Sequence, residues 1–106
     1  MRRIDLGGER EVTAPGSVSA RVRRLATGAH VVVIEIGPGG VVGRHPAGVR
    51  QLFTVVSGAG WVSGGDGERA PIAAGEAVVW DPEEEHESGS DTGMTAFVVE
   101  ADSFDV

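Results

Sequence analysis

The alternation of apolar and polar positions along this chain predicts short β-strands separated by frequent turns. Segments rich in Val, Ile, Thr and Phe recur between clusters of Gly and Pro, and most of them are too short to form helices. Residues 21–26 fit either a strand or one face of a helix, and we interpret them as a strand. The other strands that we predict are His30 to Ile36, Val49 to Val56, Trp61 to Ser63, Ala77 to Trp80 and Met94 to Ala101. Strands of this length and spacing are typical of a β-sandwich or a β-barrel.

Glycine and proline provide the turns that so many short strands require. Gly accounts for 17 and Pro for 5 of the 106 residues. Residues 64–67 (Gly-Gly-Asp-Gly) read as a hairpin turn, and residues 57–61 read as a tight corner between two strands. The length suits one domain, and neither an internal repeat nor a long linker divides it.

The residue types that the chain lacks exclude several kinds of chemistry. It contains no Cys, Lys, Asn or Tyr. Without Cys it has no disulfide, thiolate zinc site, iron–sulfur cluster or cysteine nucleophile. Without Lys it forms no Schiff base and has no P-loop lysine for nucleotide phosphates.

Charge is distributed unevenly and narrows the range of partners. The formal net charge is −7. Residues 70–106 contain ten acidic side chains and no Arg or Lys. Such a chain would repel nucleic acid and anionic membranes, so we expect neither as a partner. The longest aliphatic run covers only residues 31–34, and no apolar stretch follows the arginines at residues 2–3. We therefore expect a soluble, cytoplasmic protein.

One extended stretch places polar side chains beside apolar ones. Side chains alternate along a strand, so every second residue from 45 to 55 is expected on one face. That row reads His45, Ala47, Val49, Gln51, Phe53 and Val55. Two polar groups at one end and apolar groups at the other are typical of a pocket in a β-barrel.

The residues around His45 resemble the first motif of the cupin family. That motif reads Gly, five residues, His, one residue, His, three or four residues, Glu, six residues, Gly. In this chain the corresponding residues are Gly39, His45, Ala47 in the second His place, Gln51 in the Glu place, and Gly58.

A second set of residues resembles the second cupin motif, which reads Gly, five residues, Pro, one residue, Gly, two residues, His, three residues, Asn. The corresponding residues are Gly75, Pro82 one place late, His86 in register, and Ser90 in place of Asn. The sixteen residues between Gly58 and Gly75 match the spacer of small single-domain bacterial cupins. His30 matches neither motif, and we expect it to be structural.

The resemblance implies an all-β jelly-roll barrel, also called a double-stranded β-helix. It covers residues 30–101, so we expect a single cupin domain over residues 1–106, with the barrel at 30–101. Residues 1–29 would add edge strands or an N-terminal arm. The family resemblance and the small core also imply a homodimer.

Cupins usually hold a divalent metal with two His and one Glu of the first motif and the His of the second. Carried over place by place, the ligands here would be His45, Gln51 and His86, and Ala47 would leave one place empty. Three neutral ligands imply weaker binding than a set with a carboxylate, but open coordination positions admit substrate. Fe, Mn, Ni, Cu and Zn all suit this set. Alternatively, the three side chains form a hydrogen-bonded polar cluster without metal.

Apolar side chains are expected to line a pocket next to these ligands. The candidates are Val49, Phe53, Val55, Trp80 and Phe97, although the aromatic ones also suit an ordinary core. The acidic residues 83–87 read as a solvated loop that leads to His86.

The resemblance implies a protein that binds a small molecule and a divalent transition metal in its barrel. If it is an enzyme, the family favours dioxygenase or isomerase chemistry, but no catalytic residue stands out and no general base lies outside the ligand set. The alternatives are a metal-free cupin that binds or senses a small ligand, and a subunit whose barrel serves assembly.

Overall fold

The described part of the chain folds into β-strands joined by turns. The structure is a computed structural model, and it describes residues 1–3, 9–24 and 30–104. Within these ranges there are eight strands and no helix, and therefore no helix that could span a membrane. The strands are β1 (Arg10–Glu11), β2 (Val18–Arg24), β3 (His30–Pro46), β4 (Gln51–Ser63), β5 (Arg69–Ala73), β6 (Ala77–Trp80), β7 (Glu85–Ser90) and β8 (Met94–Glu100).

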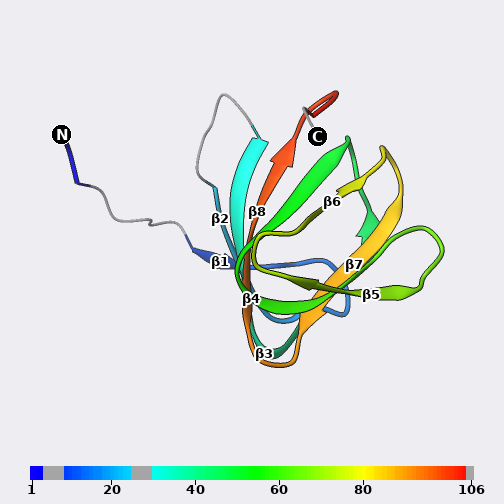
Figure 1. Cartoon of the computed structure of the whole chain (residues 1–106), viewed down its shortest axis with the longest axis horizontal. Coiled ribbons are helices and arrows are strands. Elements are labelled where there is room, and N and C mark those ends of the chain that lie inside the picture. Colours follow the sequence, from blue (N-terminus) through cyan, green and yellow to red (C-terminus); the bar gives the residue numbers. More distant parts are fainter. Residues whose placement is uncertain (4–8, 25–29, 105–106) are drawn as a thin grey trace.

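Two long strands, β3 and β4, each belong to both walls of the barrel (Figure 1). Their first halves form one wall, in which β3 pairs with β2 and β8 while β4 pairs with β8 and β6. Their second halves form the other wall, in which β7 lies between them and β5 extends β4. All of these pairs are antiparallel, and the all-β jelly-roll barrel expected from the sequence is confirmed.

The predicted strands all overlap observed ones, but the strand boundaries differ from the prediction. β3 runs on through residues 37–40, and β4 joins two predicted strands through residues 57–60, because glycine at these places bends a strand instead of ending it. β5 and β7 were not predicted, and the expected acidic loop at residues 83–87 is wrong from Glu85 onward, where β7 begins. The strand predicted at residues 21–26 is present as far as Arg24, and residues 25–26 lie outside the described part.

Gly58 shows why the bend in β4 requires glycine. Its φ is 77°, in the left-handed region, and the β4–β8 register shifts between Val55 and Ser57 just before it. A Cβ atom on Gly58 would lie 2.2 Å from the carbonyl oxygen of Gly93. Glycine therefore allows both the backbone conformation and the close approach of the turn before β8.

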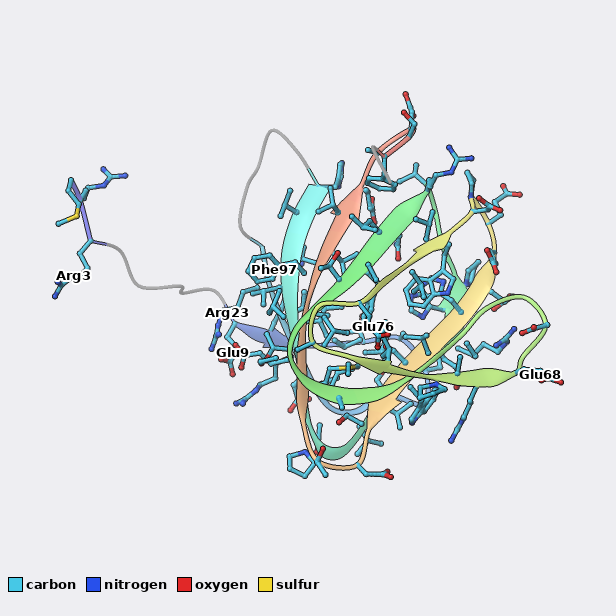
Figure 2. All side chains as sticks on the ribbon, in the orientation of Figure 1. Arg3, Glu9, Arg23, Glu68, Glu76 and Phe97 are labelled. Atoms are coloured by element: carbon cyan, nitrogen blue, oxygen red, sulfur yellow. The ribbon has the colours of Figure 1, made fainter. Side chains whose placement is uncertain are left out.

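The hairpin turn predicted at residues 64–67 joins β4 to β5. The amide of Gly67 donates to the carbonyl of Gly64 (2.9 Å), and Gly67 has a φ of 75°. Glu68, beside this turn, lies on the far side of the barrel from Arg23 (Figure 2).

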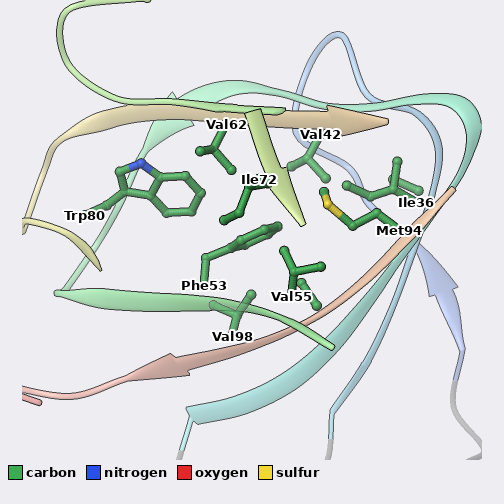
Figure 3. Packing of buried hydrophobic residues seen from close by; sticks show 11 residues of the cluster. Ile36, Val42, Phe53, Val55, Val62, Ile72, Trp80, Met94 and Val98 are labelled. Atoms are coloured by element: carbon green, nitrogen blue, oxygen red, sulfur yellow. The ribbon is translucent and has the colours of Figure 1, made fainter. Parts of the chain in front are cut away.

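The core lies between the two walls and is formed by inward side chains of β2, β3, β4, β5, β6 and β8 (Figure 3). Phe53 and Val55 of β4 are each 1% exposed, and Trp80 of β6 packs against the same cluster. The remaining members are Ala20, Ile36, Val42, Val62, Ile72, Met94, Ala96 and Val98. Trp80, Phe53, Val42 and Val98 of this cluster also line a pocket at the open end of the barrel.

Candidate ligand and metal site

The open end of the barrel contains a pocket of about 680 Å³, within the range of small-molecule sites. Its floor is apolar and its polar groups are few. The apolar lining residues on the barrel strands are Val22, Val32, Ile34, Val42, Phe53, Trp80 and Val98, and the polar ones include His45, Gln51, His86, Ser88 and Glu100. A pocket of this composition suits a small organic molecule with an apolar body and a polar end.

His45 and His86 meet in this pocket because their strands pair. They are register partners on β3 and β7, and the register shifts between Val42 and His45. Their ring centroids lie 4.4 Å apart, and the ring planes are tilted by 56°. Two imidazoles that are distant in sequence are therefore close enough to act on one ligand.

Backbone carbonyls determine which ring nitrogen of each histidine is free. Nδ1 of His45 lies 2.6 Å from the carbonyl oxygen of Gly43, and Nδ1 of His86 lies 3.1 Å from that of Glu84. A carbonyl only accepts hydrogen bonds, so each Nδ1 carries the hydrogen and each neutral ring keeps its lone pair on Nε2. This is the arrangement that orients a histidine for metal binding.

His86 is held in its neutral form by its surroundings. It is 3% exposed and stacks on Trp80, with ring centroids 4.2 Å apart and an angle of 24° between the planes. Burial is the main cause that lowers the pKa of His86, the hydrogen bond to the Glu84 carbonyl raises it in part, and the neighbouring His45 lowers it while the carboxylates of Glu84 and Glu85 raise it by smaller amounts. The Nε2 lone pair of His86 is consequently available at neutral pH.

Gln51 begins β4 beside the histidines and contacts a carboxylate. Its Nε2 donates to Oε1 of Glu100 (3.1 Å), and the two residues are register partners on β4 and β8. Glu100 was not among the site residues predicted from the sequence. The alternation along the predicted strand offered a signal, because Glu100 has the same parity as Met94 and Val98, which face inward.

The predicted pocket-lining residues occupy three different environments. Phe53 and Trp80 line the pocket with ring centroids 5.3 Å apart, whereas Val55 is buried in the core beyond it. Val49 and Phe97 are 45% and 41% exposed and do not line it, contrary to expectation. Val49 lies in the turn between β3 and β4, where the expected alternation is interrupted, and Phe97 alternates with the inward Val98.

An N-terminal segment, which sequence analysis treated as an edge strand or arm, forms part of the pocket wall. Residues 10–15 all line the pocket. Val12 packs against the core, and its amide donates to the carbonyl of Ala20 (2.9 Å). Its apolar side chain between polar neighbours, Glu11 and Thr13, was the available signal, but a single residue does not show which surface it covers.

Two imidazoles and one amide are the neutral donors that this pocket could offer a divalent metal. Within residues 1–3, 9–24 and 30–104, no three His, Cys, Asp or Glu side chains are grouped to hold an ion, so the third protein donor would be the Gln51 amide oxygen. Two imidazoles and an amide suit a transition metal but contribute no negative charge. Ala47, which occupies the second His place of the first motif, is 1% exposed, and its amide donates to the Glu84 carbonyl (3.0 Å).

Comparisons with known proteins point to one family. Residues 32–100 match the sequence profile of the cupin domain. The polyketide cyclase RemF from Streptomyces resistomycificus is similar, with a TM-score of 0.78 and 20% identity, over 97% of this chain and 80% of that one. A predicted oxalate decarboxylase from Thermotoga maritima has a TM-score of 0.70 and 21% identity, over 81% and 90% of the two chains. At these identities the structural likeness concerns the fold. No curated protein matches the sequence.

Proposed function

The chain belongs to the cupin family, and on that basis we propose that its pocket binds a small organic molecule beside a divalent metal ion. The observation that carries this proposal is the pair of adjacent imidazoles, with ring centroids 4.4 Å apart, whose Nδ1 atoms are bonded to backbone carbonyls. Both free Nε2 atoms belong to residues that line the same pocket. Two proteins with similar barrels are named as a polyketide cyclase and a predicted oxalate decarboxylase, and both names refer to small organic substrates, which supports the proposal.

In this proposal the chain's residues divide the work between binding the ion and binding the organic ligand. His45, His86 and Gln51 would hold the metal, which when bound supplies Lewis-acid or redox chemistry at an oxygen atom of the ligand. Phe53 and Trp80 exclude water from one side of the pocket, and the apolar floor accepts the hydrocarbon part of the ligand. Dioxygenase or isomerase chemistry is the finer form of the proposal.

A metal-free binding cupin is the second candidate. It is favoured by the hydrogen bond between Gln51 and Glu100, because this bond engages the amide NH₂ group without an ion. The two imidazole Nε2 atoms would then accept hydrogen bonds from a ligand hydroxyl or amine. The apolar floor would serve both candidates equally, so metal binding is the property that separates them.

Metal content of protein purified without a histidine tag tests the proposal. After treatment with a chelator, the chain should take up about one Zn²⁺, Co²⁺, Ni²⁺, Mn²⁺ or Fe²⁺ per molecule, as counted by elemental analysis after dialysis. His86→Ala should abolish uptake, because it removes one of only two imidazole donors. His30→Ala is the matched control, because His30 is mostly exposed and does not line the pocket.

Uptake below about a tenth of an ion per chain with every metal would overturn metal binding and favour the metal-free candidate. Equal uptake by wild type and His86→Ala would instead place the ion elsewhere.

A further inference from the structure

We infer that Glu100 is a positioning residue for this pocket, which orients the Gln51 amide and supplies the negative charge that the His45–Gln51–His86 donor set lacks. The inference rests on the proposed function, because it concerns the same donor set. It goes beyond that function by assigning a role to a residue on β8, outside both motif segments.

The orientation of the Gln51 amide follows from what a carboxylate can do in a hydrogen bond. An ionised carboxylate only accepts, so the amide must present its NH₂ group to Glu100. The Nε2 to Oε1 distance of 3.1 Å fits such a bond. Since Nε2 is engaged, the Oε1 atom of Gln51 is the end of the amide that is left for the pocket. Without Glu100, either end of the amide could face the pocket.

The fold, and not the local sequence, brings Gln51 and Glu100 together. Gln51 begins β4 and Glu100 ends β8, and the two are direct cross-strand partners although they are 49 residues apart. Both side chains line the pocket. Register therefore determines their contact, as it does for His45 and His86.

Few other charged groups lie near the carboxylate of Glu100 in the pocket. Its Oε2 lies 3.7 Å from Nδ1 of His30, whose side chain is 74% exposed, so solvent weakens this second contact. The other charged lining residues are Arg10 and Glu11 on β1, and both are exposed. Glu100 is 30% exposed, which makes it the most enclosed carboxylate of the pocket lining. A carboxylate one hydrogen bond away from a neutral donor favours a bound cation and makes that donor more basic.

The competing explanation is that the bond only ties β4 to β8. Two substitutions separate these roles. Glu100→Gln keeps an oxygen that can accept from Gln51 but removes the charge, whereas Glu100→Ala removes both. A tie between strands would affect the stability of the metal-free chain, and a positioning role would also affect the geometry and affinity of the bound ion.

Co²⁺ is a suitable probe, because its visible absorption reports the ligands around it. We expect Glu100→Ala to weaken Co²⁺ binding by about 10–100-fold and to change the absorption band, with Glu100→Gln in between. Gln51→Ala should weaken binding at least as much, and adding Glu100→Ala to it should cost less than Glu100→Ala costs in the wild type, because part of the Glu100 effect acts through Gln51. Glu68→Ala removes the same charge outside the pocket lining and should bind Co²⁺ like the wild type (Figure 2).

The outcomes distinguish this inference from the function on which it rests. If the wild type binds Co²⁺ and His86→Ala does not, while both Glu100 variants keep the wild-type affinity and band, the positioning role is overturned and the proposed function stands. If the wild type binds no Co²⁺, both are overturned. Should Glu100→Ala fail to fold, Glu100→Gln and Gln51→Ala still decide the question through their affinities and spectra.

Discussion

His86 couples the chemistry of the pocket to the packing of the barrel. Its ring contacts His45 on one side and stacks on Trp80, a member of the core cluster, on the other. Burial lowers its pKa, so the native state favours the neutral ring. Protonation of this buried ring disfavours the native state, so the stability of the fold depends on pH.

The metal-free protein should lose stability as the pH falls below about 6.5, the ordinary pKa of histidine. Between that value and the lowered pKa of native His86, the unfolded chain binds a proton that the native chain does not. The free energy of unfolding therefore rises with pH across this window, and the contribution of His86 to stability is fully present above it. Urea unfolding at pH 7.5 and 5.5 measures the difference, which should shrink in His86→Asn and persist in His30→Asn. An unchanged difference in His86→Asn would contradict this reasoning.

Individual residues also show which parts of the site can be recognised from patterns in the sequence. The spacing of His45, Gln51 and His86 predicted a common pocket, and the structure places all three in one. Glu100 and residues 10–15 carry no comparable spacing, because strand register and the path of the N-terminal segment bring them there. Val49 was misplaced because alternation holds within a strand and not through the turn that follows β3.

At the scale of elements, strand identity was predictable and strand length was not. Val- and Ile-rich segments identified the strands around residues 30–36 and 94–100. Gly and Pro at residues 37–40 and Gly at 58 and 60 suggested breaks, but β3 and β4 continue through them. A glycine that bends a strand and a glycine that ends one look alike in sequence, because only the partner strands decide whether pairing continues.

Gly58→Ala should destabilise the fold more than Gly67→Ala. Both glycines have similar positive φ values, 77° and 75°, so each substitution carries a backbone cost of about 1–2 kcal/mol. A Cβ at Gly67 has no atom within 4 Å, whereas one at Gly58 would meet the Gly93 carbonyl oxygen at 2.2 Å. Moving that backbone should cost about 1–3 kcal/mol more. Thermal and urea unfolding of the two variants measure the gap, and equal losses would refute the importance of the close approach.

At the scale of the whole molecule, the outer face of the wall formed by β3, β8, β4 and β6 is apolar. One cross-strand row contains Val31, Val99, Leu52 and Val79. Phe97, next to this row, is 41% exposed, and Val33 is 4% exposed although it lies outside the core cluster. Beside them, on β2, Arg21 and Arg23 form ion pairs with Glu9 and Glu35 (Figure 2). An apolar centre beside charges of both signs is complementary to a second copy of itself.

We therefore predict that this outer face forms the homodimer expected from the sequence. Phe97→Asp would bury an unpaired charge in the interface and should weaken association by about tenfold or more. Sedimentation equilibrium over a range of concentrations measures the effect. Val18→Asp alters an exposed valine outside this row and serves as the control. A wild type that stays monomeric at every concentration, or a Phe97→Asp variant that associates equally well, would refute this interface.

The sharing of β3 and β4 between the two walls also bears on how the barrel comes apart. Neither wall can open alone, because each contains half of the same two strands. Local opening is therefore confined to the short outer strands, and disruption of β3 or β4 requires global unfolding. His45 and Gln51 lie at the end of β3 and the start of β4, so both belong to the two strands that the walls share. Two of the three proposed donors are thereby attached to the same pair of strands, which keeps their spacing constant while the short outer strands fluctuate.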